Sequence, residues 1–121
     1  MWGSRNEIKV VKDYLIINDT LIKINDICLI RPNRNQSMGG IEILLTGKGF
    51  ITIYNIGMIE LKSHLPLPMI NDFFINISKI TAVFPIPKPR TYPGTYVYFE
   101  GTEKIDLPFI ESNYIIDEIL G

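Results

Sequence analysis

The sequence predicts a small α+β protein, mostly β. It is built from two tandem pseudo-repeats of one multi-strand β unit, packed as a sandwich or a small barrel, with a short C-terminal helix. Three observations lead to this prediction: an internal repeat, short apolar runs bounded by turn signals, and one helical apolar stripe at the end of the chain.

The internal repeat relates Asn18–Pro32 to Asn71–Pro85 at an offset of 53 residues. Six of these fifteen positions are identical, including the Asn-Asp pair that opens each segment and the proline that closes it. After one inserted residue, the match continues from Gly40–Ile53 to Gly94–Leu107, with glycines at matching positions. The chain therefore contains two copies of one β-rich segment.

Neither half is expected to fold alone, because a unit of about fifty residues buries too little apolar surface. We therefore expect a single domain, 1–121, made of two pseudo-repeats at about 14–65 and 67–121. Strand alternation places matching apolar residues on one face, and these should form a shared core. The expected core residues are Ile22, Ile24, Ile27, Ile41, Ile43, Leu45, Ile51 and Ile53, with their matches Ile75, Ile77, Ile80, Thr95, Val97, Phe99, Ile105 and Leu107.

In the first half, the apolar runs predict strands at Ile8–Val11, Tyr14–Ile17, Leu21–Ile24, Ile27–Arg31, Ile41–Thr46 and Phe50–Tyr54. Asn18-Asp19 is a turn signal. Gly47-Lys48 is expected to form a two-residue hairpin turn with glycine first, which suits type II′. The spacing of Met58, Leu61 and Leu65 indicates a short helix.

In the second half, strands are predicted at Phe73–Ile77, Ile80–Phe84, Thr95–Glu100 and Lys104–Leu107. Gly101-Thr102 repeats the turn with glycine first. The last segment predicts a helix that begins near Ser112, because Ile115, Ile116, Ile119 and Leu120 form a helical apolar stripe.

Composition excludes several classes. The net charge of −1 and the pI of about 5.8 disfavour a nucleic-acid-binding protein, which needs a basic excess. One cysteine, Cys28, rules out an intrachain disulfide. No apolar stretch approaches the roughly 20 residues of a membrane span. The first residues lack the apolar core of a signal peptide, so we expect a cytoplasmic protein.

The residues of the chain predict a protein that is not an enzyme. His64 is the only histidine, and no cysteine or histidine spacing suits a zinc site. The Gly47-Lys48-Gly49 segment has the wrong spacing for a phosphate-binding loop. We therefore expect no cofactor, no metal and no catalytic residue.

The best candidates for a binding site are two equivalent long loops, Pro32–Gly40 and Pro85–Gly94. They hold or adjoin Arg31, Arg34, Lys88, Arg90 and Tyr92. Arginine forks bind phosphate oxygens in pairs, and tyrosine stacks on a base, so converging loops would suit a phosphorylated small molecule such as a nucleotide. Alternatively, the loops lie apart and their cations only aid solubility.

Tyr96 and Tyr98 lie on one face of a predicted strand. Tyrosine is favoured at protein interfaces, so this face is a candidate partner surface. The alternative is that the terminal helix covers it.

These observations favour a non-catalytic binding protein. Its size and isoleucine-rich composition suit an accessory protein of a phage or mobile element that acts by protein–protein interaction or inhibition. The alternative is a protein that sequesters or senses a phosphorylated small molecule. A homo-oligomer is expected, because small β units either protect or pair their open edges.

Overall fold

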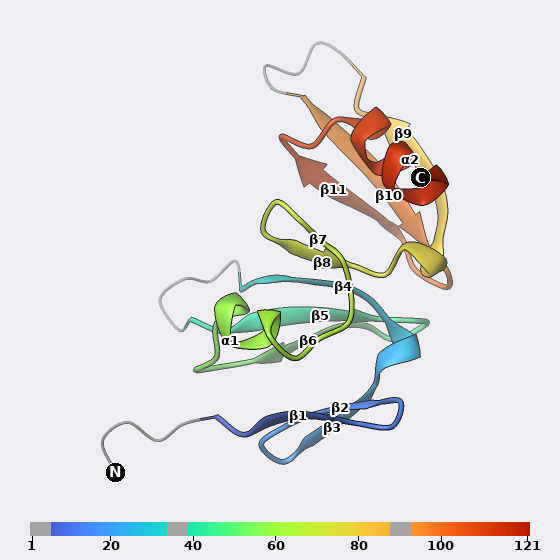
Figure 1. Ribbon diagram of the computed structural model, residues 1–121. Helices are drawn as coiled ribbons and strands as arrows, with labels where there is room; N and C mark the ends of the chain where they lie inside the picture. Colours follow the sequence, from blue (N-terminus) through green and yellow to red (C-terminus); the bar gives the residue numbers. More distant parts are fainter. Residues whose placement is uncertain (1–5, 34–38, 88–92) are drawn as a thin grey trace.

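The chain folds as three stacked β-sheets. The computed structural model describes residues 6–33, 39–87 and 93–121, and in this part of the chain it holds eleven strands. The first sheet has the strand order β1-β2-β3, the middle sheet β6-β5-β4-β8-β7, and the third sheet β11-β10-β9. Figure 1 shows the first sheet at the bottom, the middle sheet above it and the third sheet at the top.

The first half of the chain contributes two layers. Its elements are β1 (Ile8–Val11), β2 (Tyr14–Ile17), β3 (Thr20–Lys23), a 3-10 turn at Ile24–Asp26, β4 (Ile27–Pro32), β5 (Ile41–Leu45), β6 (Gly49–Ile53) and α1 (Met58–Lys62). The β2–β3 hairpin lies in the first sheet, and β4–β6 form most of the middle sheet.

The second half repeats this order of elements from β2 onward. They are β7 (Met69–Ile70), β8 (Phe73–Ile75), a 3-10 turn at Ile77–Lys79, β9 (Ile80–Pro85), β10 (Gly94–Phe99), β11 (Lys104–Pro108) and α2 (Ser112–Leu120). The β7–β8 hairpin lies in the middle sheet, and β9–β11 form the third. Each half therefore places its hairpin one layer below its own three-stranded meander.

The two halves are joined by pairing between β4 and β8. Ile30 lies opposite Phe74, and Leu29 lies opposite Ile75, in an antiparallel ladder. Asn76 extends the joint, because its backbone N–H donates to the Cys28 carbonyl at 2.9 Å and its side-chain amide donates to the Ile27 carbonyl at 2.8 Å. The second hairpin thus adds to the edge of the first meander.

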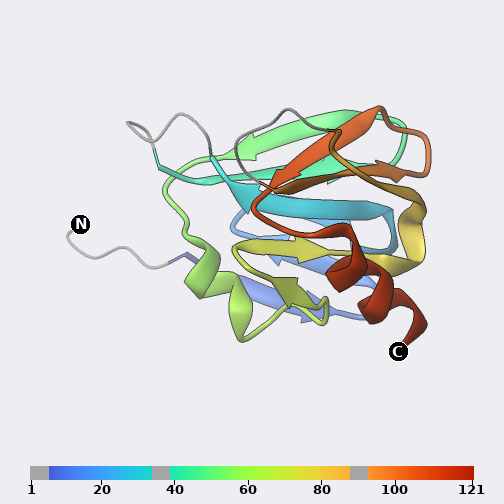
Figure 2. The same cartoon turned by 90° about the horizontal axis from the view of Figure 1, so that it is seen from above.

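Two apolar cores lie on the two sides of the middle sheet. The first core holds Leu15, Ile17, Ile22, Ile27, Ile30, Ile41, Ile43, Ile56, Leu61, Leu65 and Phe74. The second core holds Cys28, Leu29, Leu44, Ile70, Ile75, Val97, Phe99, Leu107, Ile110 and Ile115. Figure 2 looks down through the stack, with the third sheet in front of the middle one.

The structure confirms a mostly β fold of α+β class with a short C-terminal helix. The closed barrel, one of the two packings predicted, is not formed, because the described strands divide into three separate sheets. The expected single shared core is replaced by two. Leu44 lies on the face of β5 opposite to Ile43 and is also buried, because the third sheet covers this second face.

The glycine turns differ from the prediction. In the first, the Lys48 N–H donates to the Leu45 carbonyl at 3.1 Å, and Gly47 has φ of +70°. Gly47 is therefore the third residue of the turn, where type II turns require a positive φ, and not the first residue of a type II′ turn. Gly101 occupies the same place in the turn between β10 and β11, with φ of +71°.

Phe74 and Leu21 occupy equivalent positions in the two hairpins, and their substitution tests the joint between the halves. Phe74 is 1% exposed and Leu21 is 61% exposed. We expect Phe74→Ala to lower the free energy of unfolding by about 3 kcal/mol, because it empties part of the first core. Leu21→Ala should change it by less than about 0.5 kcal/mol. Urea denaturation of both variants measures the difference, and equal losses would contradict the assignment.

Candidate functional site

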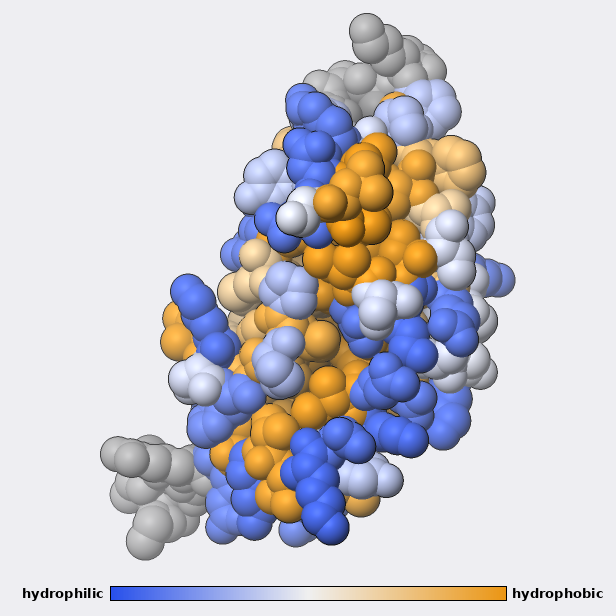
Figure 3. All heavy atoms as spheres, turned by 45° about the vertical axis from the view of Figure 1, so that its right-hand side comes forward, coloured by the Kyte–Doolittle hydropathy of each residue, from blue (hydrophilic) through white to orange (hydrophobic). Residues whose placement is uncertain are grey.

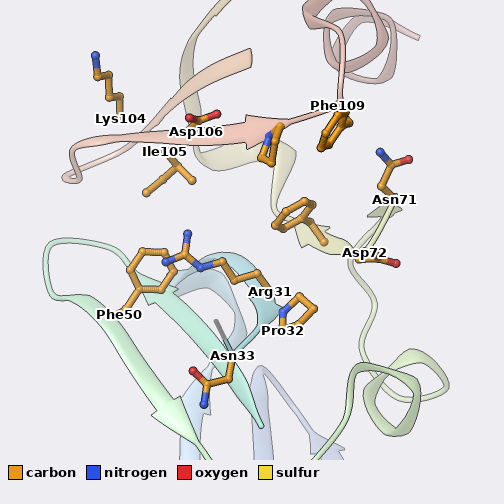
Figure 4. A pocket seen from close by; sticks show the side chains of 12 residues that line it. Arg31, Pro32, Asn33, Phe50, Asn71, Asp72, Lys104, Ile105, Asp106 and Phe109 are labelled. Atoms are coloured by element: carbon orange, nitrogen blue, oxygen red, sulfur yellow. The ribbon is translucent and has the colours of Figure 1, made fainter. Parts of the chain in front are cut away.

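A cleft of about 1020 Å³ lies between the middle and third sheets. Its lower wall includes Arg31 of β4 and Phe50 of β6, and its upper wall includes Ile105 of β11 and Phe109. The turn of the second hairpin, with Asn71 and Phe73, lines one side. Figure 4 shows Ile105 and Phe109 facing the Arg31–Phe50 side across the gap. The cleft therefore depends on the stacking of the two halves.

Among the sequence-predicted site residues that the structure describes, Arg31 lines this cleft. Its Nε lies 3.0 Å from Glu42 Oε1, and the two side chains are only 11% and 13% exposed. Its guanidinium carbon lies 3.9 Å from the centre of the Phe50 ring, an arrangement visible in Figure 4. Removing one partner of such a buried pair costs about 3 kcal/mol or more. A ligand phosphate would have to compete with Glu42 for this cation.

Tyr96 and Tyr98 lie on the outer face of the third sheet, which we define as the face turned away from the middle sheet. Their neighbours Val97 and Phe99 alternate with them and enter the second core. Lys104 lies with its Nζ 4.1 Å from the centre of the Tyr96 ring. Tyr98 meets Phe84 edge to face, with ring centres 5.7 Å apart.

The terminal helix does not lie on this outer face. Its one buried residue, Ile115, packs in the second core with Val97 and Phe99, on the opposite side of the sheet. Ile116, Ile119 and Leu120 of the predicted helical stripe are exposed. Figure 3 shows apolar side chains gathered over the upper part of the molecule, where α2 and β9 lie.

Four sequence-predicted site residues, Arg34, Lys88, Arg90 and Tyr92, lie outside the described residues. The structure describes both flanks of each loop, and Asn33 and Pro93 are the flanking residues that lie nearest the cleft. Asn33 lines the cleft, and the Pro93 carbonyl accepts a hydrogen bond of 2.7 Å from the Phe109 N–H. Phe109 also lines the cleft. A flank of each loop therefore lies at or beside the same cleft.

Phe109 combines exposure with an unfavourable backbone. Its side chain is 66% exposed, and its φ is +65°. A bulky residue at positive φ is a genuine outlier, and such residues gather at functional sites. The equivalent residue of the first half is Asn55, with φ of +62°. Asparagine tolerates this conformation, so the second half places an exposed phenylalanine where its own repeat offers an easier residue.

Other chemistry-bearing residues lie away from the cleft. His64 is exposed after α1, and its backbone N–H caps that helix by donating to the Leu61 carbonyl. Cys28 is buried in the second core, and burial raises the pKa of its thiol. Among the described residues, no group of three or more His, Cys, Asp or Glu side chains is placed to hold a metal ion. No helix in the described ranges is long and apolar enough to cross a membrane.

Sequence reasoning missed four aromatic or cationic residues near these surfaces: Phe50, Phe84, Lys104 and Phe109. Strand alternation could have found Phe84. Its neighbour Val83 takes a position that faces the core, so Phe84 falls on the exposed face of the same strand, where a large apolar residue is unusual. Phe109 carried a signal in the repeat itself, since it aligns with Asn55. Phe50 and Lys104 had no signal, because their ring contacts join different strands.

Comparison of the chain with protein families, with curated proteins and with solved structures gives no match.

Phe109 offers a direct test of the strain at the cleft. We expect Phe109→Asn to raise the free energy of unfolding by about 1 kcal/mol, because asparagine tolerates the left-handed conformation and little burial is lost. Phe84→Asn is the matched control, since Phe84 is 51% exposed but lies in a strand. It should not stabilise the protein. Chemical denaturation compares the two, and a stability loss in Phe109→Asn would show that its side chain packs in the fold.

Proposed function

We propose that this protein is a non-catalytic binding protein that acts by protein–protein interaction and takes a segment of its partner into the cleft between the middle and third sheets. The observation that carries this proposal is Phe109, an exposed aromatic residue kept at positive φ beside the cleft. A cytoplasmic location is part of the same proposal.

The chemistry of the cleft supports a protein partner. Phe50, Phe73 and Phe109 line it together with Pro32, Pro108 and Ile105, and this lining suits apolar side chains. Asn71 also lines it and brings an exposed side-chain amide that can meet a peptide backbone. An aromatic anchor surrounded by such a lining is the usual composition of an interface hot spot.

Electrostatics favours a peptide over a phosphorylated ligand. Arg31 is neutralised by Glu42 and stacked on Phe50. Lys104 lines the cleft but extends away from its interior in Figure 4 and lies over Tyr96. Asp72 and Asp106 also line the cleft and would repel a phosphate. Both cations among the described residues that line the cleft, Arg31 and Lys104, are thus already engaged by other groups.

Affinity capture tests the proposal. Tagged protein is exposed to an extract of the cells that make it, and a photo-crosslinking residue at position 109 marks direct contacts. We expect discrete partner proteins that are retained by the unmodified chain and lost with Phe109→Asn, because the variant keeps the fold but lacks the anchor. Tyr54→Asn is the control, since Tyr54 is 48% exposed elsewhere on the surface. Equal capture by all three proteins would refute the role of the cleft.

A second candidate function is the sequestering or sensing of a phosphorylated small molecule. The place of Arg31 in the cleft, next to the start of the first long loop, favours it. A thermal-shift screen against nucleotides and cyclic nucleotides tests it. Stabilisation should grow with ligand concentration as RT ln(1 + [L]/Kd). The shift should disappear in Arg34→Ala or Arg90→Ala and persist in Phe109→Asn. No shift with any nucleotide would eliminate this candidate.

A further inference from the structure

The two halves are joined by pairing of β4 with β8, and the strand equivalent to each of these has an open edge at one end of the molecule. The first half offers the edge of β4, and the second half fills it with β8. The equivalent of β4 is β9, which pairs with β10 on one side and with no described strand on the other. The equivalent of β8 is β3, which is also an edge strand of its sheet.

The backbone N–H and C=O groups at the open edges of β9 and β3 point outward at the positions that pairing like that of β4 with β8 requires. The Ile86 N–H donates to the Gly94 carbonyl, so alternate residues of β9 turn their backbone groups toward β10 and leave those of Thr81 and Val83 facing outward. In β3, Thr20 closes the hairpin opposite Ile17, and the backbone groups of Leu21 therefore face outward. Val83 is the equivalent of Ile30, and Leu21 is the equivalent of Phe74.

Side-chain burial differs between the halves in the way a missing hairpin predicts. Ile27 and Ile30 of β4 are fully buried, whereas their equivalents Ile80 and Val83 are half-buried. Leu65 is 6% exposed in the first core, and its equivalent Ile119 is 39% exposed. The second core therefore lacks the cover that the second hairpin gives the first core.

The matching apolar side chain is exposed at the other end of the molecule. Phe74 is 1% exposed because it enters the first core, while Leu21 is 61% exposed. Leu45 and Ile53 are half-buried, although their equivalents Phe99 and Leu107 are buried against the middle sheet. Each end of the molecule thus exposes apolar surface that the internal joint covers.

The helix α2 does not obstruct the open edge. It packs against both β9 and β10, so it lies over the inner face of the third sheet and not alongside β9. In Figure 1, β9 forms the edge of the third sheet that is opposite to β11.

From these observations we infer that the protein associates with further copies of itself, head to tail, by adding β3 of one copy to the open edge of β9 of another. Val83 pairs with Leu21 of the second copy, and Ala82 with its Ile22, in the register that joins Ile30 to Phe74 and Leu29 to Ile75. Ala82 and Tyr98, on the outer face of the third sheet, are the equivalents of Leu29 and Leu44. Within the chain, Leu29 and Leu44 pack against the third sheet. In the same way, the face with Ala82 and Tyr98 then packs against the middle sheet of the copy that contributes β3. This contact is heterologous, so it continues to larger assemblies or closes into a ring.

One residue sets the strength of this association. Lys23 stands at the position equivalent to Asn76, whose side chain bonds the Ile27 carbonyl in the internal joint. Lysine on an edge strand opposes strand addition. The contact between copies therefore lacks one hydrogen bond and is weaker than the internal joint.

Sedimentation velocity over a wide range of protein concentration tests the inference with the full chain. The average mass should rise beyond that of a dimer. Leu21→Lys should give a monomer, since a charge at this exposed position does not disturb the fold. Val11→Lys is the control, because Val11 is 46% exposed on β1, at the other edge of the same sheet. It should associate like the unmodified protein.

Lys23→Asn should tighten the association between copies about tenfold, the value of one added hydrogen bond.

A mixing experiment separates head-to-tail contact from a symmetric dimer. Val83→Pro removes the outward N–H of β9 and should also give a monomer, with folding checked by circular dichroism. Mixed one to one with Leu21→Lys, it should form dimers that grow no further. The Leu21→Lys variant keeps an intact β9 edge and the Val83→Pro variant keeps an intact β3, so only one kind of contact can form. A single monomeric mass for the unmodified protein at every concentration, or association unchanged by Leu21→Lys, would overturn the inference. Capture of a foreign protein through Phe109 would be unaffected by either result.

Discussion

The pairing of β4 with β8 is the interaction on which the rest of the structure depends. Only two residue pairs make this ladder, Ile30 with Phe74 and Leu29 with Ile75, and Asn76 extends it with a backbone and a side-chain hydrogen bond. Without it the second hairpin would be an isolated two-stranded ribbon, which is marginal in water. With it, the hairpin widens the middle sheet, seals the first core with Phe74 and supports the third sheet from below. The cleft exists because this contact fixes the distance between the second and third layers.

Much of the fold follows from local sequence signals. The Asn-Asp turns, the alternating isoleucines and the prolines that end β4 and β9 define the strands, because each acts within a few residues. What they do not define is the partner of each hairpin. Nothing local distinguishes β8 beside β4 from β8 beside its own meander. The choice depends on Phe74 and Asn76 finding partners about fifty residues away. For the same reason Leu44 could not be assigned to a core, since its burial needs a third layer.

The candidate site divides in the same way. Arg31 was identifiable from the sequence because it adjoins a long polar loop. Its pairing with Glu42 and its stacking on Phe50 required three strands to be placed side by side. That pairing changes the meaning of the residue, since a buried cation held by a carboxylate is a structural group before it is a ligand-binding one. Phe109 is the reverse case. Its position in the sequence is ordinary, and only its φ of +65° beside an exposed ring marks it as unusual.

A duplicated unit that joins by strand addition has a general difficulty, because the contact that holds the two halves together is open at both ends. The chain limits this difficulty without removing it. Pro85 stands where Pro32 stands in β4 and keeps the usable part of the β9 edge short, and Lys23 replaces the amide that strengthens the internal joint. Pro85 limits the edge of β9 as Pro32 limits that of β4, whereas Lys23 weakens strand addition between copies and leaves the addition within the chain intact. The exposed Leu21 argues that the open ends are kept for use, since a polar residue at that position would cost the monomer nothing. A weak head-to-tail contact lets assembly depend on concentration, while the covalent link keeps each pair of units folded in dilute solution.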